Sequence, residues 1–284
     1  MTIASPALTS CLATCRRLEN ATALKHRSPS TQPLLRSATE ADLPSMGRIL
    51  LSVFLDSMAP LFGLDRSPMY EAFRQAQIRR LFARCQLQPA STKIVVATDG
   101  DGDKQGGAGN VLGFVVWILD VTPRETSSSS DDHEESNTVK KSLPPLPPFP
   151  PGQGAALYQA FGDAMSAVQR TKMGDRPRCY LKYLCVDPTS QRRGVGTTLM
   201  SHVCADAEKA GLPIYLEAAP TVSAGPFYKK FGFEDLGVFD ACEVPLDLSS
   251  VKGDEQGESK CQETMTMQLF AMKLETQVVR RDEV

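Results

Sequence analysis

An apolar run that leads through a glycine-containing turn into an amphipathic helix is the feature that most constrains the fold of this 284-residue chain. The run spans residues 180–186, the turn reads Gln191-Arg192-Arg193-Gly194-Val195-Gly196, and the helix extends to about residue 210. Apolar side chains recur along the helix with the period of about 3.6 residues that is typical of a face packed on a sheet. Another apolar run follows at 214–218, and a strand–helix–strand unit predicts a parallel crossover. The chain is therefore predicted to have an α/β (or α+β) architecture.

The turn has the composition of a phosphate-binding site. The first N–H groups of a helix have no intrahelical partner and lie at the positive end of the helix dipole. Gly194 and Gly196 let a ligand approach the main chain closely, and Arg192 and Arg193 add positive charge. The turn lacks the lysine of a P-loop and the third glycine of a dinucleotide-binding fingerprint. The sequence thus predicts a pyrophosphate site that belongs to neither of these classes.

The composition disfavours several classes of protein. The 31 Lys and Arg residues are balanced by 33 Asp and Glu residues, and no long basic tract occurs, so a general nucleic-acid binder is disfavoured. No apolar run approaches the ~20 residues that span a bilayer, so no membrane segment is predicted. The eight cysteines form no C-x-x-C pair and there are only three histidines, so neither a metal site nor a disulfide framework is predicted. Such cysteines fit a reducing, cytoplasmic compartment.

Three segments are predicted to lie outside the folded core. Residues 1–33 are rich in Ser, Thr and Ala and are interpreted as a disordered leader. The basic residues of this leader also suit a mitochondrial transit peptide, which is the alternative to a cytoplasmic location. Residues 120–151 combine a Ser run, an acidic patch and a Pro-rich end, which predicts a disordered insertion. Its Pro-rich end suits either an SH3- or WW-type partner or a solvated spacer. Residues 276–284 are interpreted as a C-terminal tail.

The rest of the chain alternates between strand and helix patterns. Further strands are predicted from Val-, Ile- and Phe-rich runs at 34–36, 93–98, 111–119, 234–244 and 264–274. Further helices are predicted from the spacing of apolar residues at 39–53, 68–85, 155–172 and 226–231. The strands are expected to form one mixed sheet with helices packed against it.

The turn and two later segments resemble the GNAT acetyltransferase superfamily. The acetyl-CoA motif of that family is Q/R-x-x-G-x-G/A at the end of the fourth strand, and Gln191, Gly194 and Gly196 match each of its defined positions. The segments at 216–220 (LEAAP) and 225–233 (GPFYKKFGF) are similar to the motifs that follow in the family. Three motifs in this order and at these separations are quite specific.

The resemblance implies the domain organisation and the fold in more detail. It implies an N-acetyltransferase domain at 34–275, interrupted by the insertion, and residues 173–177 look most similar to fungal members. The implied fold is a central mixed, mostly antiparallel sheet with helices on both faces. A parallel strand pair in that sheet splays apart at the CoA site.

The resemblance also implies acetyl-CoA as the cosubstrate. In the family, the backbone of the strand before the motif pairs with the pantetheine arm, and N–H groups of the turn hold the pyrophosphate. The residues at the matching positions are Leu184, Cys185 and Val186 on the strand, and Gln191, Arg192, Arg193, Gly194, Val195, Gly196 and Thr197 in and after the turn.

A tyrosine and a glutamate are the candidates for the chemistry. The departing thiolate needs a proton, and Tyr228, which matches the family's tyrosine beside the cofactor sulfur, is the candidate acid; the alternative is a packing role. Glu217 is the candidate base, directly or through water, because a carboxyl in a partly dry cleft has a raised pKa; the alternative is a structural role. Cys185 is expected to be a buried apolar residue rather than a nucleophile, and His202 is expected to face solvent.

These observations predict an acetyl-CoA-dependent N-acetyltransferase that acts on a primary amine by direct attack in a ternary complex. The acceptor pocket is expected between the first two helices at 54–70, with Met58, Phe62 and Leu64, and in the loop before Tyr228. Its apolar lining favours a small or mixed-polarity amine over a strongly acidic one. Protein lysines, protein N-termini, polyamines, aminoglycoside-like sugars and arylamines all stay open as acceptors, and so does the oligomeric state.

The alternative is a non-catalytic CoA-binding or partner-recruiting protein on the same scaffold. Such a protein would keep the phosphate turn and use the insertion at 120–151 to recruit partners. It would have no need of Tyr228 and Glu217, which therefore distinguish the two hypotheses.

Overall fold

The computed structural model describes residues 32–62, 68–100, 109–121, 142–148, 154–218, 224–245 and 264–275. All of them belong to one unit, residues 32–284. Nearly all of the predicted leader, most of the predicted insertion and the whole predicted tail lie outside the described residues.

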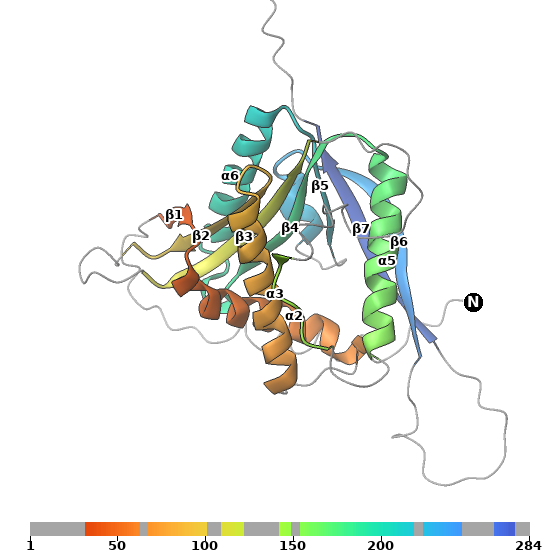
Figure 1. Ribbon diagram of the computed structural model, residues 1–284. Coiled ribbons are helices and arrows are strands. Elements are labelled where there is room, and N and C mark those ends of the chain that lie inside the picture. Colours follow the sequence, from red (N-terminus) through yellow and green to blue (C-terminus); the bar gives the residue numbers. More distant parts are fainter. Residues whose placement is uncertain are drawn as a thin grey trace, which may run out of the picture. The chain divides into compact units, whose positions relative to one another are not determined.

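A seven-stranded sheet forms the centre of this unit (Figure 1). Neighbouring strands are antiparallel except β4 and β5, which run parallel. This arrangement confirms the prediction of a mixed, mostly antiparallel sheet. In spatial order the strands are β1 (Leu34–Ser37), β2 (Thr92–Thr98), β3 (Val111–Asp120), β4 (Arg178–Val186), β5 (Ile214–Ala218), β7 (Thr264–Leu274) and β6 (Glu234–Pro245).

Helices connect the strands, and some of their bounds differ from the prediction. The first predicted helix continues nine residues beyond 53, to Phe62, and the predicted helix at 226–231 begins and ends two residues earlier. The second difference arises because a turn closed by Gly232, which has a φ of +88°, already follows Lys229. The helices are η1 (Glu40–Asp42), α2 (Leu43–Phe62), α3 (Pro68–Leu87), α5 (Gly154–Met173), η3 (Pro188–Ser190), α6 (Val195–Ala210) and α7 (Ala224–Lys229).

One face of the sheet is covered by α6. The predicted apolar side of this helix is buried against β2–β5 and β7 through Leu199, Met200, Val203 and Ala207. Trp117 of β3 fixes the helix further, because its indole N–H donates a hydrogen bond to Asp206 (2.9 Å). His202 is exposed, as predicted, and its ring lies edge-on to Trp117. The packing of α6 holds the turn that precedes it in a defined position.

The opposite face is covered by α2, α3 and α5. Apolar side chains of α2 and α3 pack on Ile94, Val96, Phe114 and Val116 of β2 and β3. Side chains of α5 pack on Tyr180 and Tyr215, farther along the same face. Helices therefore lie on both faces, as the predicted fold requires.

The two parallel strands separate after a short stretch of pairing. Within the described residues, β4 pairs with β5 only at Cys179–Ile214 and Tyr180–Tyr215, whereas its other edge stays paired with β3 as far as Val186. This geometry confirms the predicted splay, and it opens the sheet on the side where the phosphate turn lies.

A short part of the predicted insertion contacts the domain. Leu143 is only 6% exposed, and Arg80 of α3 donates a hydrogen bond to the carbonyl of Pro144 (2.9 Å). The sequence predicts disorder throughout 120–151; the structure describes residues 142–148 of that range and places Leu143 and Pro144 against the domain. None of the helices in the described part of the chain is both long and apolar enough to cross a membrane.

Candidate active site

The predicted phosphate turn has a backbone that suits anion binding. Gly194, at the start of α6, has a φ of +84°, and Arg192 is the one described residue other than glycine with a positive φ (+59°). The N–H groups of residues 195–197 precede the first helical hydrogen bond, which Thr198 donates to the Gly194 carbonyl (2.9 Å). The side chains of Arg192 and Arg193 are exposed. The turn thus presents free N–H groups and two guanidinium groups to an anion.

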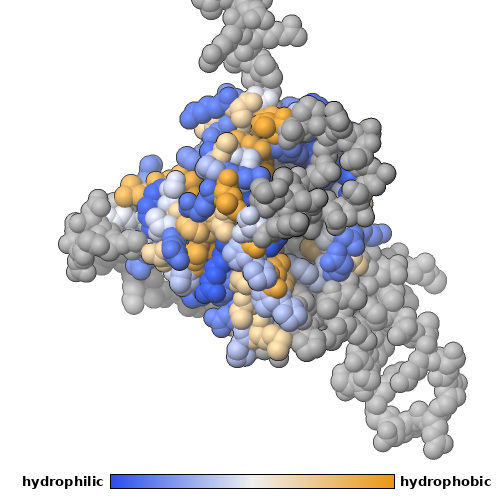
Figure 2. Space-filling model, in the orientation of Figure 1, coloured by the Kyte–Doolittle hydropathy of each residue, from blue (hydrophilic) through white to orange (hydrophobic). Residues whose placement is uncertain are grey.

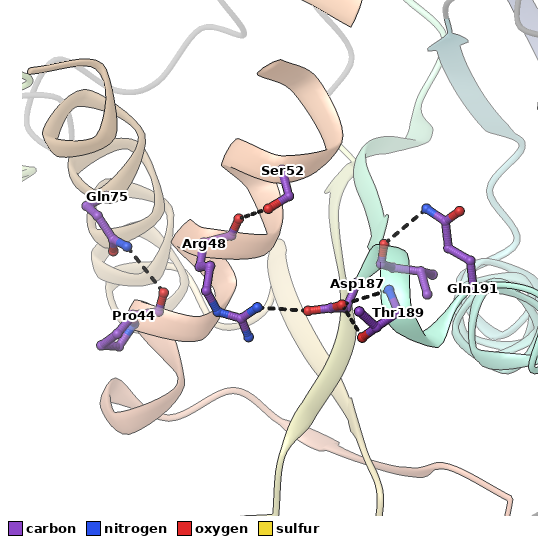
Figure 3. A network of polar contacts seen from close by, with 8 residues as sticks. Pro44, Arg48, Ser52, Gln75, Asp187, Thr189 and Gln191 are labelled. Carbon is purple, nitrogen blue, oxygen red and sulfur yellow. Dashed lines mark hydrogen bonds and ion pairs between the residues drawn. The ribbon is translucent and has the colours of Figure 1, made fainter. Parts of the chain in front are cut away.

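A network of hydrogen bonds fixes the connection between β4 and this turn (Figure 3). Oδ1 of Asp187 accepts hydrogen bonds from the backbone N–H (3.0 Å) and the hydroxyl (2.6 Å) of Thr189, and Asp187 thereby caps η3. Oδ2 of Asp187 accepts one from Nη1 of Arg48 on α2 (2.9 Å). Gln191, the first residue of the motif, donates from Nε2 to the Val186 carbonyl (3.4 Å). The turn is therefore held against the end of the strand.

The edge of β4 that faces the splay is available for pairing. Leu184, Cys185 and Val186 pair with β3 on one side and, among the described strands, with none on the other. Gly113 of β3 lets the two strands approach closely here, since a Cβ on it would lie 2.7 Å from the Cys185 carbonyl oxygen. An extended chain of amide groups could add to this edge as a further strand does. The predicted cosubstrate residues thus fit the pantetheine arm and the pyrophosphate of CoA.

Glu217 lies on β5, on the face that α2, α3 and α5 cover. Burial raises the pKa of its carboxyl to about 7, although hydrogen bonds from Tyr215 and Tyr180 and the charge of Lys182 oppose that shift. The hydroxyls of Tyr180 on β4 and Tyr215 on β5 both lie near this carboxyl. A carboxyl with a pKa near 7 is well suited to exchange a proton at neutral pH.

Tyr228, on α7, is packed among aromatic rings and lies close to Cys185. The centroid of its ring is 5.1 Å from that of Phe227 and 5.6 Å from that of Phe233. Burial raises the pKa of its hydroxyl well above the ordinary value, and the nearby Cys185 adds to that shift. The side chain therefore packs against aromatic neighbours, as the packing role expects, and keeps a protonated hydroxyl, as the role of acid requires. Tyr228 and Glu217 lie on elements that border the splay between β4 and β5.

The predicted acceptor region is described in part. The side chains of Met58 and Phe62, and Leu64 as a whole, lie outside the described residues. Phe54 is partly buried, and its ring packs edge-on against Tyr183 of β4 with the centroids 5.9 Å apart. This end of α2 therefore lies on the same face of the sheet as Glu217.

A polar network joins α3 to α5 on the face of the sheet that carries Glu217, and sequence reasoning missed it. Nε of Arg74 donates to the Tyr70 hydroxyl (2.7 Å) and Nη1 to the side-chain oxygen of Gln77 (2.8 Å). Nε2 of Gln77 in turn donates to the Tyr158 hydroxyl on α5 (2.6 Å). The sequence does contain a signal for this network. Residues 70, 74 and 77 are polar and have the spacing of one helical face, on a helix whose apolar residues are buried.

The described residues contain no group of three His, Cys, Asp or Glu side chains that could hold a metal ion.

Known acetyltransferases are similar to this chain. Residues 153–235, which include the turn, Glu217 and Tyr228, match the family model described as "Acetyltransferase (GNAT) domain". A Corynebacterium glutamicum protein described as "histone acetyltransferase HPA2 and related acetyltransferase" is 18% identical, with a TM-score of 0.44 over 84% of this chain and 96% of its own. A ribosomal-protein-alanine N-acetyltransferase from Brucella melitensis is 15% identical, with a TM-score of 0.44 over 84% and 98%. Likenesses this distant carry no information on the acceptor.

Proposed function

Because the chain belongs to the GNAT acetyltransferase superfamily, we propose that it transfers an acetyl group from acetyl-CoA to a primary amine. The amine attacks directly while both substrates are bound. The alternative route through an acetylated cysteine is disfavoured at Cys185, which is 1% exposed and whose thiol pKa is raised to about 12 by burial. A thiol of that kind is a poor nucleophile at neutral pH.

The turn and the open edge of β4 support acetyl-CoA as the donor. The N–H groups from Arg192 to Thr197 and the two exposed arginines would hold the pyrophosphate. The backbone of Leu184–Val186 would pair with the amides of the pantetheine arm. Bound in this way, acetyl-CoA supplies an acetyl group activated as a thioester.

One observation carries the proposal: a carboxyl with a pKa near 7 and a protonated phenol border the same splay in the sheet. Glu217 takes a proton from the acceptor ammonium, directly or through one water, because only the neutral amine can attack. Tyr228 donates a proton to the departing sulfur, because burial keeps its hydroxyl protonated. A protein that only bound CoA would need neither group in this position.

The direct test is thiol release from acetyl-CoA with a panel of primary amines. Turnover with at least one class of amine is expected. Silence across the whole panel, with CoA bound in a calorimetric titration, would instead favour the non-catalytic CoA-binding protein.

Tyr228→Phe tests the role of the phenol. Loss of a general acid typically lowers turnover by ~10²–10⁴-fold. The ring and its aromatic contacts are retained, so the Kd for CoA is expected to stay the same. A parallel loss of binding and turnover would show that Tyr228 packs the site and does not act as its acid.

A further inference from the structure

A positive charge is buried on the face of the sheet that carries Glu217. Arg74 of α3 is 4% exposed, and an arginine side chain keeps its charge in proteins. Its neighbours are neutral: it donates hydrogen bonds to Tyr70 and Gln77, and its guanidinium lies 5.6 Å from the ring centroid of Phe54 and 5.0 Å from that of Tyr70. Within the described residues no carboxylate pairs with Arg74.

These contacts use part of the hydrogen-bonding capacity of Arg74. A guanidinium has five N–H donors, and the bonds to Tyr70 and Gln77 engage Nε and Nη1. Nη2 makes no hydrogen bond with a described residue. Buried charges are usually paired because an unpaired one carries a large desolvation cost, of which aromatic contacts offset a small part. The two Nη atoms of arginine form a fork that matches a carboxylate.

Arg74 lies close to the proposed reaction centre. Burial raises the pKa of the Cys185 thiol to about 12, and the nearby charge of Arg74 opposes that shift. The same Cys185 lies near the hydroxyl of Tyr228. Phe54 links the guanidinium of Arg74 to Tyr183 on β4 by direct ring contacts. The charge is therefore next to the strand edge at which the thioester would lie.

The lining around Arg74 is rich in hydroxyl groups, and the described residues that contact Arg74 carry no carboxyl group; Glu217 lies on the same face beside Tyr180 and Tyr215. Five of the six tyrosines of the chain lie on this face of the sheet or on the helices that cover it. Lys182 adds a second cation, 6.0 Å from the ring centroid of Tyr180 and 5.9 Å from that of Tyr183. Such a lining suits an acceptor that carries a negative charge. The five tyrosines are Tyr70, Tyr158, Tyr180, Tyr183 and Tyr215.

We propose that Arg74 binds a carboxylate of the acceptor, so that the amines acetylated by this protein carry a carboxylate, as amino acids do. The inference rests on the proposed function, because it assigns the acceptor of the same site. It departs from the sequence-based expectation of an acceptor that is not strongly acidic, because that expectation considered the apolar residues of α2 and not the face of α3.

Two other roles for Arg74 lead to different results. If Arg74 only joins α3 to its neighbours, its loss lowers stability and affects all amines alike. If it donates to the thioester oxygen, its loss lowers kcat for all amines alike. Recognition of a carboxylate is the role that changes the preference between two acceptors that differ in that group alone.

The first experiment compares matched acceptors with the full chain. Thiol release gives kcat/KM for alanine, methionine, phenylalanine and lysine, for their amides and for their decarboxylated amines. The amides have a less basic amine and the decarboxylated compounds a more basic one, so a preference over both cannot arise from basicity. The carboxylate is expected to be preferred by at least about tenfold in one or more series. Equal or lower kcat/KM for the carboxylate in every series overturns the proposal.

Substitutions at two positions then assign that preference. Arg74→Gln removes the charge, Arg74→Lys keeps the charge without the fork, and Gln77→Glu gives Arg74 an internal carboxylate while its packing stays. The preference ratio is expected to fall to near one in Arg74→Gln and Gln77→Glu and to persist in part in Arg74→Lys. An unchanged ratio in Arg74→Gln contradicts the assignment. Calorimetric titration with CoA shows which variants are folded. If Arg74→Gln does not fold, the preference ratio of Gln77→Glu decides whether Arg74 binds the carboxylate.

The role of Arg74 can be tested even if the protein is not an acetyltransferase. If no amine is acetylated although CoA binds, calorimetry with 3-phenylpropionate and its amide, in the presence of CoA, still tests the anion site. Binding of the carboxylate alone, abolished by Gln77→Glu or Arg74→Gln, supports the role of Arg74. Absence of any binding, or equal binding of the amide, overturns it.

Discussion

Arg48 of α2 and Asp187 at the end of β4 form an ion pair in which Nη1 and Oδ2 are 2.9 Å apart (Figure 3). Burial alone would raise the pKa of Asp187, but hydrogen bonds from Thr189 and Arg48 outweigh it and hold that pKa below its ordinary value. The pair joins a helix on one face of the sheet to the strand end that leads into the phosphate turn. The position of the turn therefore depends on α2 as well as on α6.

Substitution of Asp187 is expected to lower the free energy of unfolding more than substitution of Arg48. Asp187→Ala removes the cap of η3, which is worth ~1 kcal/mol, and weakens CoA binding because the strand end loosens. Arg48→Met removes a pair whose arginine is 58% exposed, which is worth at most ~1 kcal/mol. Because the folded pKa of Asp187 is lowered, its contribution is complete at neutral pH and is lost as the pH falls below about 4. Urea unfolding at pH 7 and pH 3 measures both effects.

Arg176→Met is the matched control for this pair. Arg176 is also an exposed arginine, and it pairs with Glu275 at 3.6 Å. This variant is expected to leave the Kd for CoA unchanged. Equal losses of stability and of CoA affinity in Arg48→Met and Asp187→Ala would show that the ion pair, and not the cap, holds the turn.

Gly194→Ala is expected to weaken CoA binding through the backbone. The left-handed conformation of Gly194 costs an L-residue roughly 1–2 kcal/mol, whereas an added Cβ would meet no other atom within 4 Å. Gly162→Ala on α5 is the matched control, since its Cβ also meets nothing and its φ is ordinary; it should stabilise the helix by ~0.5–1 kcal/mol. Calorimetric titration with CoA and thermal unfolding distinguish the two, and unchanged CoA affinity in Gly194→Ala would exclude this turn as the pyrophosphate site.

Gly113→Ala is expected to disturb the same site from β3. The added Cβ would lie 2.7 Å from the Cys185 carbonyl oxygen and 3.2 Å from the Cα of Val186, so the strands must separate. Overpacking of this kind costs ~1–3 kcal/mol, and the shift falls where β4 enters the turn. Both the Tm and the affinity for CoA should fall. In a double variant with Gly113→Ala, Val195→Ala removes a further contact of the new Cβ, at 3.2 Å, but leaves the backbone clash. The Tm and the affinity for CoA should therefore recover little, and full recovery would contradict this explanation.

Side-chain patterns that are local in the sequence predicted most of this fold. The Val-, Ile- and Phe-rich runs of β2 and β3 and the apolar face of α6 each appear within a few residues, so most strands and helices were located to within one or two residues. The turn at Gln191–Gly196 was found for the same reason, since its glycines and arginines are contiguous. The end of α2 was missed, because the apolar spacing was followed only to residue 53 whereas the helix continues past Pro60 to Phe62.

Contacts between distant segments could not be predicted in this way. Arg48 and Asp187 are 139 positions apart, and Gln77 and Tyr158 are 81 apart. No periodic pattern links such residues, because their proximity results from the order of strands in the sheet. The buried charge of Arg74 is invisible for the same reason: the spacing of α3 shows a polar face, but only the packed structure shows that this face is enclosed.

Glu217→Gln is expected to change the pH dependence of both catalysis and stability. The carboxyl must be ionised to accept a proton, so kcat/KM of the wild type should rise with pH through the pKa of about 7. The variant should lack this rise and be slower by ~10²-fold or more above pH 7. Stability should change in the opposite sense. Because the folded pKa is raised from 4.5 to about 7, the contribution of Glu217 is complete below pH 4.5 and is lost as the pH rises through 7.

The two profiles of Glu217→Gln test the base independently of the acceptor. At about 1.4 kcal/mol per pKa unit, the loss of stability between pH 4.5 and pH 8 is on the order of 3 kcal/mol for the wild type relative to the variant. Urea unfolding in that range measures it without any substrate. A parallel pH dependence of stability in the two proteins would place the pKa of Glu217 near its ordinary value. If the rise of kcat/KM near pH 7 then persisted in the variant, another group would be the base. If the stability profile changed and the kinetic profile did not, Glu217 would be a buried carboxyl that takes no part in the proton transfer.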